Sequence, residues 1–273
     1  SDYNKKNKWK VSKYPFKQIP YKESLDMYGT DKPDLRNPLI IKDVTNIFKD
    51  SDFKIFSSKI KEGQIVKCII VPNLASQPRS FFDKLNNWAK EEGAAGLGYI
   101  NYIDNEYKGP IAKNMDVKKL DQFYLNNNET AFFICDELEN AQFFAGKVRD
   151  KLGNELKLIN QDSFEFCWII DYPMYEYDEK LKKINFSHNP FSMPQGGMKS
   201  LLEKKPLEIL AYQYDIVCNG VELSSGAIRN HKPDIMYKAF EIAGYDKKMV
   251  EEKFSGILNA LKYGAPPHGG SAP

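Results

Sequence analysis

Apolar positions between residues 38 and 158 alternate between two kinds of pattern. Runs rich in β-branched and aromatic residues, which are typical of strands, cover 64–71, 97–102 and 130–135. Segments with apolar residues three or four positions apart, which predict helices, cover 80–92, 117–124 and 140–152. We therefore expect a compact α+β unit in this part of the chain.

The segment from 159 to 273 shows a different pattern, in which strands follow one another across short turns. The predicted strands cover 166–172, 174–177, 183–186, 214–218 and 221–230. A loop rich in proline and glycine covers 189–197, and helices are expected at 235–243 and 247–262. Strands joined by short turns favour an antiparallel sheet with flanking helices.

Residues 1–37 end in a cluster of turn formers. Pro33 and Pro38 prevent a helix from continuing here, and Gly29 permits a positive φ. We expect a boundary at this point, so that the chain falls into the segments 1–37, 38–158 and 159–273. The basic stretch at 5–13 reads as a solvated terminus, to which we assign no function.

Composition agrees with a folded protein of balanced charge. Apolar residues make up 42% of the 273 positions and aromatic residues 13%, which excludes a disordered chain. The 39 basic and 37 acidic side chains leave a net charge of +2, so the chain as a whole lacks the charge that drives nonspecific nucleic-acid binding. Any contact with RNA must be local, and we expect no DNA partner.

The cysteines indicate a reducing compartment, and the hydropathy indicates that the chain does not span a membrane. Four cysteines lie far apart in apolar runs, without a C-x-x-C pair, and we interpret them as reduced, buried thiols. No apolar run approaches the roughly 20 residues that span a bilayer, and the N-terminus is polar. We expect a cytoplasmic protein without a membrane partner.

The stretch 217–229 carries the most informative chemistry. Side chains an even number of positions apart share a face of a strand, so Glu222 and Arg229 share one only if a bulge at Ser224-Ser225-Gly226 shifts the phase. A ligand could then lie against these small residues, with the carboxylate available for a cation and the guanidinium for an anion. A cross-strand ion pair beside a bulge is the alternative that the residues alone leave open.

The histidines and the known enzyme motifs give less information about function. His188 lies at a strand end before a proline, where it could contact a carboxylate or phosphate ligand or simply cap a turn. His268 is equally ambiguous, and no Cys/His spacing predicts a zinc site. The P-loop, the dinucleotide-binding fingerprint and the nucleophile elbow are missing from the sequence, which removes those enzyme classes.

Four stretches resemble the bacterial aspartyl-tRNA synthetases, which are class II enzymes. They are 28–36 (YGTDKPDLR), 187–192 (SHNPFS), 219–229 (NGVELSSGAIR) and 261–270 (LKYGAPPHGG). The segments 93–97, 108–113 and 152–156 resemble the GAD domain that bacterial members insert into their catalytic domain. The resemblance implies a GAD domain at 38–158, flanked at 1–37 and 159–273 by parts of a class II catalytic domain.

By the same resemblance, the parent enzyme is a ligase of protein biosynthesis. It activates L-aspartate with ATP and Mg²⁺, transfers the aspartyl group to tRNA(Asp), and is a homodimer. Arg229 matches the catalytic arginine that binds the side-chain carboxylate of aspartate, and Glu222 matches the catalytic glutamate that binds ATP and the metal. His188 matches a histidine that contacts aspartate.

The chain departs from the family pattern in ways that bear on activity. Many relatives carry a second histidine where Asn189 stands. We find no counterpart of motif 1, of motif 2 with its phosphate-binding arginine, or of the anticodon-binding barrel, and the sequence stops before motif 3. We therefore expect a fragment that is inactive alone. The alternatives are a non-catalytic, synthetase-derived tRNA-binding or regulatory protein, and a GAD-bearing component of an amidotransferase.

Overall fold

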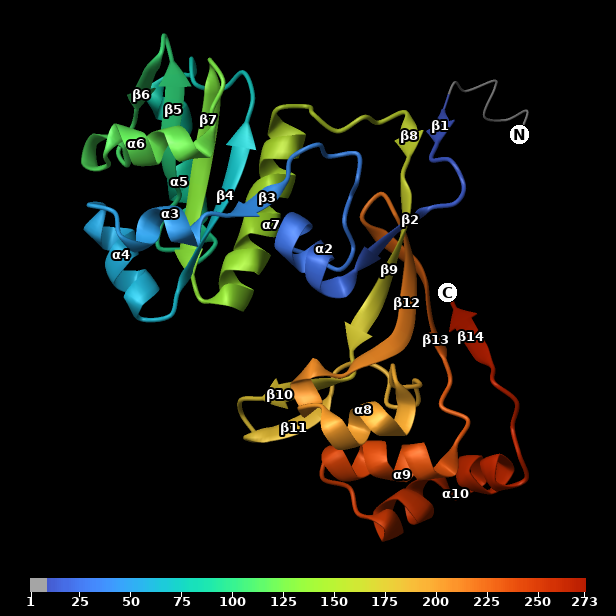
Figure 1. The fold of residues 1–273 in the computed structure, drawn as a ribbon. Coiled ribbons are helices and arrows are strands. Elements are labelled where there is room, and N and C mark those ends of the chain that lie inside the picture. The colour runs from blue at the N-terminus through green and yellow to red at the C-terminus, as the bar shows by residue number, and fades with distance from the viewer. Residues whose placement is uncertain (1–8) are drawn as a thin grey trace. The chain divides into compact units, whose positions relative to one another are not determined.

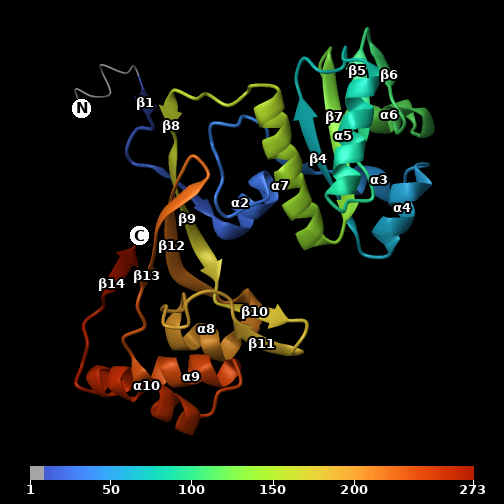
Figure 2. The ribbon, with the colours of Figure 1, turned by 180° about the vertical axis from the view of Figure 1, so that it is seen from behind.

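The computed structural model describes residues 9–273, so residues 5–8 of the basic stretch lie outside the described part. The chain forms two compact units (Figures 1 and 2). One unit comprises Ser1–Glu23 and Ser163–Pro273, and the other comprises Ser24–Asp162. The segment 38–158 thus lies inside the second unit.

The second unit is built on an antiparallel sheet with the strand order β3-β4-β7-β5-β6. Its strands are β3 (Ile41–Asp43), β4 (Ile65–Val71), β5 (Gly98–Ile103), β6 (Glu106–Lys108) and β7 (Glu129–Asp136). Its helices are α3 (Thr45–Lys49), α4 (Lys54–Lys61), α5 (Arg79–Glu91), α6 (Val117–Leu120) and α7 (Leu138–Glu155), with 3-10 turns η1 (Ala112–Asn114) and η2 (Asp121–Phe123). The expected α+β architecture is confirmed.

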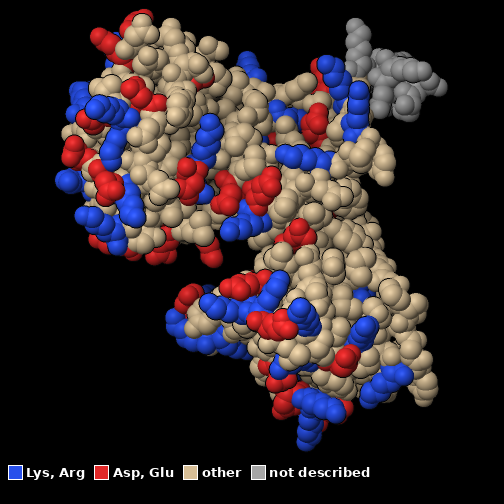
Figure 3. All heavy atoms as spheres, in the orientation of Figure 1, with Lys and Arg blue, Asp and Glu red and all other residues tan. Residues whose placement is uncertain are grey.

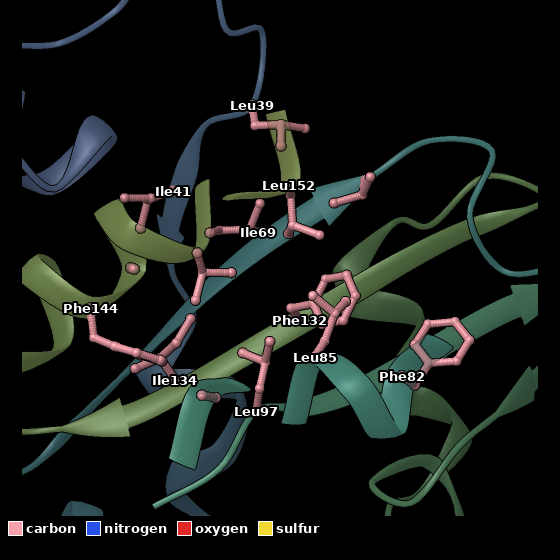
Figure 4. Packing of buried hydrophobic residues seen from close by; sticks show 14 of the residues in the cluster. Leu39, Ile41, Ile69, Phe82, Leu85, Leu97, Phe132, Ile134, Phe144 and Leu152 are labelled. Carbon is pink, nitrogen blue, oxygen red and sulfur yellow. The ribbon is translucent and has the colours of Figure 1, made fainter. Parts of the chain in front are cut away.

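Each face of this sheet carries its own hydrophobic core. Ile69 of β4 and Phe132 of β7 pack with side chains of α5 and α7, as Figure 4 shows. Their neighbours Cys68 and Phe133 point to the opposite face and pack with residues of α3 and α4. The alternation follows from the two-residue period of a strand, and it explains why β4 and β7 read as continuous apolar runs.

The first unit contains a second sheet, with the order β14-β13-β12-β9-β2 (Figure 1). Its strands are β2 (Lys17–Pro20), β9 (Phe166–Pro173), β12 (Leu210–Cys218), β13 (Val221–Ile228) and β14 (Gly269–Ala272). Only the β2–β9 pair among these strands is parallel, and β2 comes from the N-terminal segment of the chain. The remaining pairs of this sheet are antiparallel, as expected.

Smaller elements complete the first unit. They are β1 (Lys10–Val11), β8 (Ser163–Phe164), the hairpin β10 (Tyr175–Asp178) and β11 (Lys183–Phe186), α8 (Gly197–Glu203), η3 (Pro206–Glu208), α9 (Pro233–Ile242) and α10 (Lys247–Lys262). The helix α2 (Tyr21–Tyr28) lies where the chain passes from the first unit to the second.

Two local predictions need correction. The helix expected at 117–124 is a single α turn followed by a 3-10 turn, which ends where Tyr124 adopts a φ of 51°. The bulge expected at Ser224-Ser225-Gly226 lies instead at Leu223, because Val217 pairs with Glu222 while Ile216 pairs with Ser224. The extra residue therefore precedes the small-residue step.

The cysteines are free thiols, as expected. Cys68, Cys167 and Cys218 are buried, whereas Cys135 is half-buried. Burial raises the pKa of Cys68 to about 12 and that of Cys135 and Cys167 to about 11, so these side chains stay protonated near neutral pH.

Within residues 9–273, no helix is long and apolar enough to cross a bilayer. Figure 3 shows acidic and basic side chains intermingled on one face.

Candidate active site

A cavity of about 310 Å³ opens on the sheet of the first unit. It lies over β12 and β13, beside the turn that follows β11. The residues around it are Tyr172, His188, Asn189, Gln213, Asp215, Ser225, Gly226 and Arg229. The structure thus brings together two of the three predicted site residues, His188 and Arg229, which are far apart in the sequence.

The bulge at Leu223 decides which side chains of β13 face this cavity. Ser225 pairs with Asp215 and Ala227 pairs with Gln213, so these four side chains share one face of the sheet. Because the bulge shifts the phase, Glu222, which pairs with Val217, belongs to the same face. Glu222 does not line the cavity itself. It lies on the same face of β13 as Ser225, nearer to the start of the strand.

Arg229 lines the cavity, and its guanidinium is uncommitted, that is, without a hydrogen-bond or ion-pair partner among the described residues. Its backbone N–H donates a hydrogen bond of 2.8 Å to the carbonyl of His268, and its backbone bridges to that of Ser192. The guanidinium makes no hydrogen bond or ion pair with any residue of the described part of the chain. The backbone is therefore anchored on both sides, while the five N–H donors of the side chain are available for an anionic ligand.

Asp215 adds a carboxylate that the sequence analysis did not select. Its Oδ2 accepts a hydrogen bond of 2.6 Å from the hydroxyl of Tyr172, and the two residues are only 6% and 1% exposed. Tyr172 reaches Asp215 because β12 and β9 pair irregularly between Ala211 and Tyr214. A carboxylate within the mostly apolar strand β12 was the signal that could have identified it.

The loop that carries His188 is fixed by Gln213. The Nε2 of Gln213 donates to the Oγ of Ser192 at 2.8 Å and to the carbonyl of Asn189 at 3.1 Å. The Nδ1 of His188 lies 2.7 Å from the Oγ of Ser187, and its ring packs edge-on against Tyr172 with 4.9 Å between centroids. The Nε2 of His188 has no hydrogen-bond partner within residues 9–273, so it can contact a ligand.

Carboxylates on the same face could help to hold a cation. Asp215 and Glu222 provide the oxygen ligands that Mg²⁺ prefers, and Mg²⁺ usually completes its shell with phosphate oxygens and water. The residues described by the structure contain no cluster of three or more His, Cys, Asp or Glu side chains that would form a metal site alone. Two carboxylates leave coordination positions for phosphate oxygens and water, so they fit a cation that arrives with a phosphorylated ligand.

Comparison with known proteins places the chain in a family. A sequence model described as "tRNA synthetases class II (D, K and N)" matches residues 2–273. A protein named aspartate–tRNA(Asp/Asn) ligase from Paramagnetospirillum magneticum is 58% identical over 96% of this chain and 30% of its own length. Its counterpart from Zymomonas mobilis is 57% identical over 96% of this chain and 45% of its own length. The chain therefore spans less than half the length of these relatives.

Among solved structures, an aspartyl-tRNA synthetase from Entamoeba histolytica is 18% identical. The match covers 46% of this chain and 20% of that one with a TM-score of 0.27.

Proposed function

We propose that this chain, which belongs to the class II tRNA synthetases (D, K and N), is the part of an aspartate–tRNA ligase that binds the amino acid. The observation that carries the proposal is the uncommitted guanidinium of Arg229 at a cavity that also contains His188. We place the longer protein in the cytoplasm as a homodimer, and we assign its inserted GAD-type domain to residues 38–158.

Arg229 would select aspartate by its side chain. A guanidinium and a carboxylate form two parallel charge-assisted hydrogen bonds, which fix the orientation of the substrate. Asparagine offers one carbonyl oxygen and no negative charge, so it would leave the desolvated guanidinium poorly paired. The Nε2 of His188 would contact the same substrate from the turn that follows β11.

Asp215 and Glu222 would face the second substrate, ATP. When bound, Mg²⁺ neutralises phosphate charge and favours displacement at the α-phosphate. The two carboxylates would hold the cation on the face of the sheet that also presents Arg229, so that the amino acid and the nucleotide meet above Ser225 and Gly226. Most of the rate acceleration in such a site comes from positioning and charge stabilisation.

The second stage of the proposed reaction transfers the aspartyl group to the terminal adenosine of tRNA(Asp). The relatives are named for both tRNA(Asp) and tRNA(Asn). We extend the proposal to both tRNAs, since the chain is 57–58% identical to these two proteins.

Aspartate-dependent exchange of labelled pyrophosphate into ATP tests the proposal. We expect no exchange above background from the 273-residue chain alone, even at high concentration, because the sequence offers no counterpart of the phosphate-binding arginine of motif 2. The longer protein that contains this chain should support exchange.

Two results would contradict this account in different ways. Robust exchange by the 273-residue chain, abolished by Arg229→Ala, would show that the missing motifs are not needed. A longer protein that binds tRNA but supports no exchange would favour the alternative of a non-catalytic, synthetase-derived protein.

A further inference from the structure

A second and larger cavity, of about 580 Å³, lies wholly within the second unit. It is found where β5 begins and β7 ends, between α4, the start of α5 and the loop that follows β6. Its volume falls in the range of small-molecule sites, roughly 300 to 1,000 Å³.

Aromatic side chains form much of its wall. Five of the lining residues are aromatic, and four of them, Phe53, Phe56, Phe82 and Phe133, are at least nine-tenths buried. The fifth, Tyr99, is half-buried and stacks on Phe82 with 4.2 Å between ring centroids. The half-buried Tyr99 therefore offers the most accessible ring of this wall, and such a ring favours stacking with a flat, apolar ring.

Three basic side chains from separate elements surround the same cavity. They are Lys59 of α4, Arg79 of α5 and Lys113 of η1. Within residues 9–273, Lys59 and Lys113 form no ion pair. Arg79 approaches Asp83 at 3.6 Å, but both side chains are largely exposed, at 87% and 60%, so this pair is weak. The rim therefore keeps a net positive charge and favours an anionic group.

The amide of Asn86 and the hydroxyl of Tyr99 also line this cavity. The Oδ1 of Asn86 accepts a hydrogen bond of 2.9 Å from the backbone of Leu97, which fixes the amide. Its Nδ2 has no acceptor among the residues that the structure describes, so it can donate to a ligand. Desolvation raises the pKa of Tyr99, so its hydroxyl is a neutral donor at physiological pH. Both groups can recognise the edge of a polar ring.

We propose that this cavity binds a 5′-nucleotide, with the base against the aromatic wall and the phosphate at the basic rim. A purely apolar ligand would make no ionic contact with Lys59, Arg79 and Lys113. A sugar phosphate would make no stacking contact with the aromatic wall. The amide of Asn86 meets the base edge, which can both donate and accept hydrogen bonds. The nucleotide is either free or exposed in single-stranded RNA, and the site is independent of the one at Arg229.

Calorimetric titration of the 273-residue chain tests this proposal. The probes are AMP, GMP, adenosine, ribose 5-phosphate and a short single-stranded oligoribonucleotide. We expect a nucleotide or the oligonucleotide to bind at least about tenfold more tightly than adenosine or ribose 5-phosphate, because only these probes use both wall and rim. Saturation by a mononucleotide indicates a free nucleotide as the ligand, and binding of the oligonucleotide alone indicates RNA.

Matched variants locate the binding. The triple variant Lys59→Ala, Arg79→Ala, Lys113→Ala should weaken binding at least about tenfold. The control triple, Lys61→Ala, Lys84→Ala, Lys118→Ala, removes the same charge from α4, α5 and α6 without touching the cavity, and it should bind like the unaltered chain. Arg229→Ala should also leave binding unchanged, since it affects only the first unit.

Equal loss of binding in the two triple variants would overturn the proposal, because the effect would then reflect overall charge. Loss of binding in Arg229→Ala would also overturn it, by locating the nucleotide at the other cavity. Absence of binding by every probe would do so too. Equal loss in the two triple variants, or absence of binding by every probe, would leave the assignment of Arg229 to aspartate untouched.

Discussion

Replacing Arg229 with alanine in the longer protein should lower kcat/KM for aspartate by roughly thirtyfold to a few thousandfold. A desolvated, charge-assisted pair costs about 2–5 kcal/mol when one partner is removed, and each 1.4 kcal/mol corresponds to roughly a factor of ten. Arg229 is the one Lys or Arg among the described residues that line this cavity, so no neighbouring lysine or arginine can replace its guanidinium. Aspartate-dependent pyrophosphate exchange kinetics provide the measurement.

Two further variants separate charge from geometry. Arg229→Lys keeps the positive charge but loses the planar fork, so we expect an intermediate loss of kcat/KM. Lys232→Ala removes a cation three residues away that does not line the cavity, and its kinetics should match those of the unaltered protein. A kcat/KM for Arg229→Ala within about threefold of the unaltered value would be incompatible with the role assigned to this residue.

Replacing Arg149 with methionine should destabilise the second unit by about 3–5 kcal/mol. Arg149 of α7 is fully buried. Its Nε donates to the carbonyl of Leu39 at 2.6 Å, and its Nη2 donates to those of Asn37 at 2.7 Å and Asp34 at 2.9 Å. Methionine fills much of the same volume but donates nothing, so buried carbonyls would lose their partners.

Urea unfolding followed by circular dichroism measures this loss, and hydrogen exchange at the amides of α7 assigns it to the second unit. Lys147→Met, also on α7, is the control. Lys147 pairs with Glu92 at 2.8 Å on the exposed side of the helix, so its replacement should change the free energy of unfolding by less than about 1 kcal/mol. A similar small change for Arg149→Met would show that the loop at 34–39 is held by other contacts.

The long elements could be predicted from the sequence because their periodicity extends over many residues. The strands β4 and β7 and the helices α5 and α7 lie close to their predicted positions. The short elements β3, α3 and α4 were missed, because a few residues carry too little periodic signal. The strand β14 was missed for another reason: Gly269–Ala272 lacks β-forming residues and becomes a strand by pairing with β13.

The candidate site was partly predictable. The residues alone suggested a bulge that would bring Glu222 and Arg229 to one face, and the resemblance to synthetases supplied their roles. The position of the bulge at Leu223 depends on how β12 and β13 pair, which local sequence does not determine. Asp215 and Tyr172 were missed because their contact depends on irregular pairing between β12 and β9, two strands that are far apart in the chain.

The most direct test of the proposed function compares aspartate with asparagine in pyrophosphate exchange by the longer protein. The guanidinium of Arg229 pairs fully only with a carboxylate, so we predict rapid exchange with aspartate. Exchange with asparagine should have a kcat/KM lower by at least about a thousandfold, since a site built for a polar group rejects an analogue that leaves that site unpaired. Comparable exchange with both amino acids, or exchange with asparagine alone, would contradict the assignment of this cavity to aspartate.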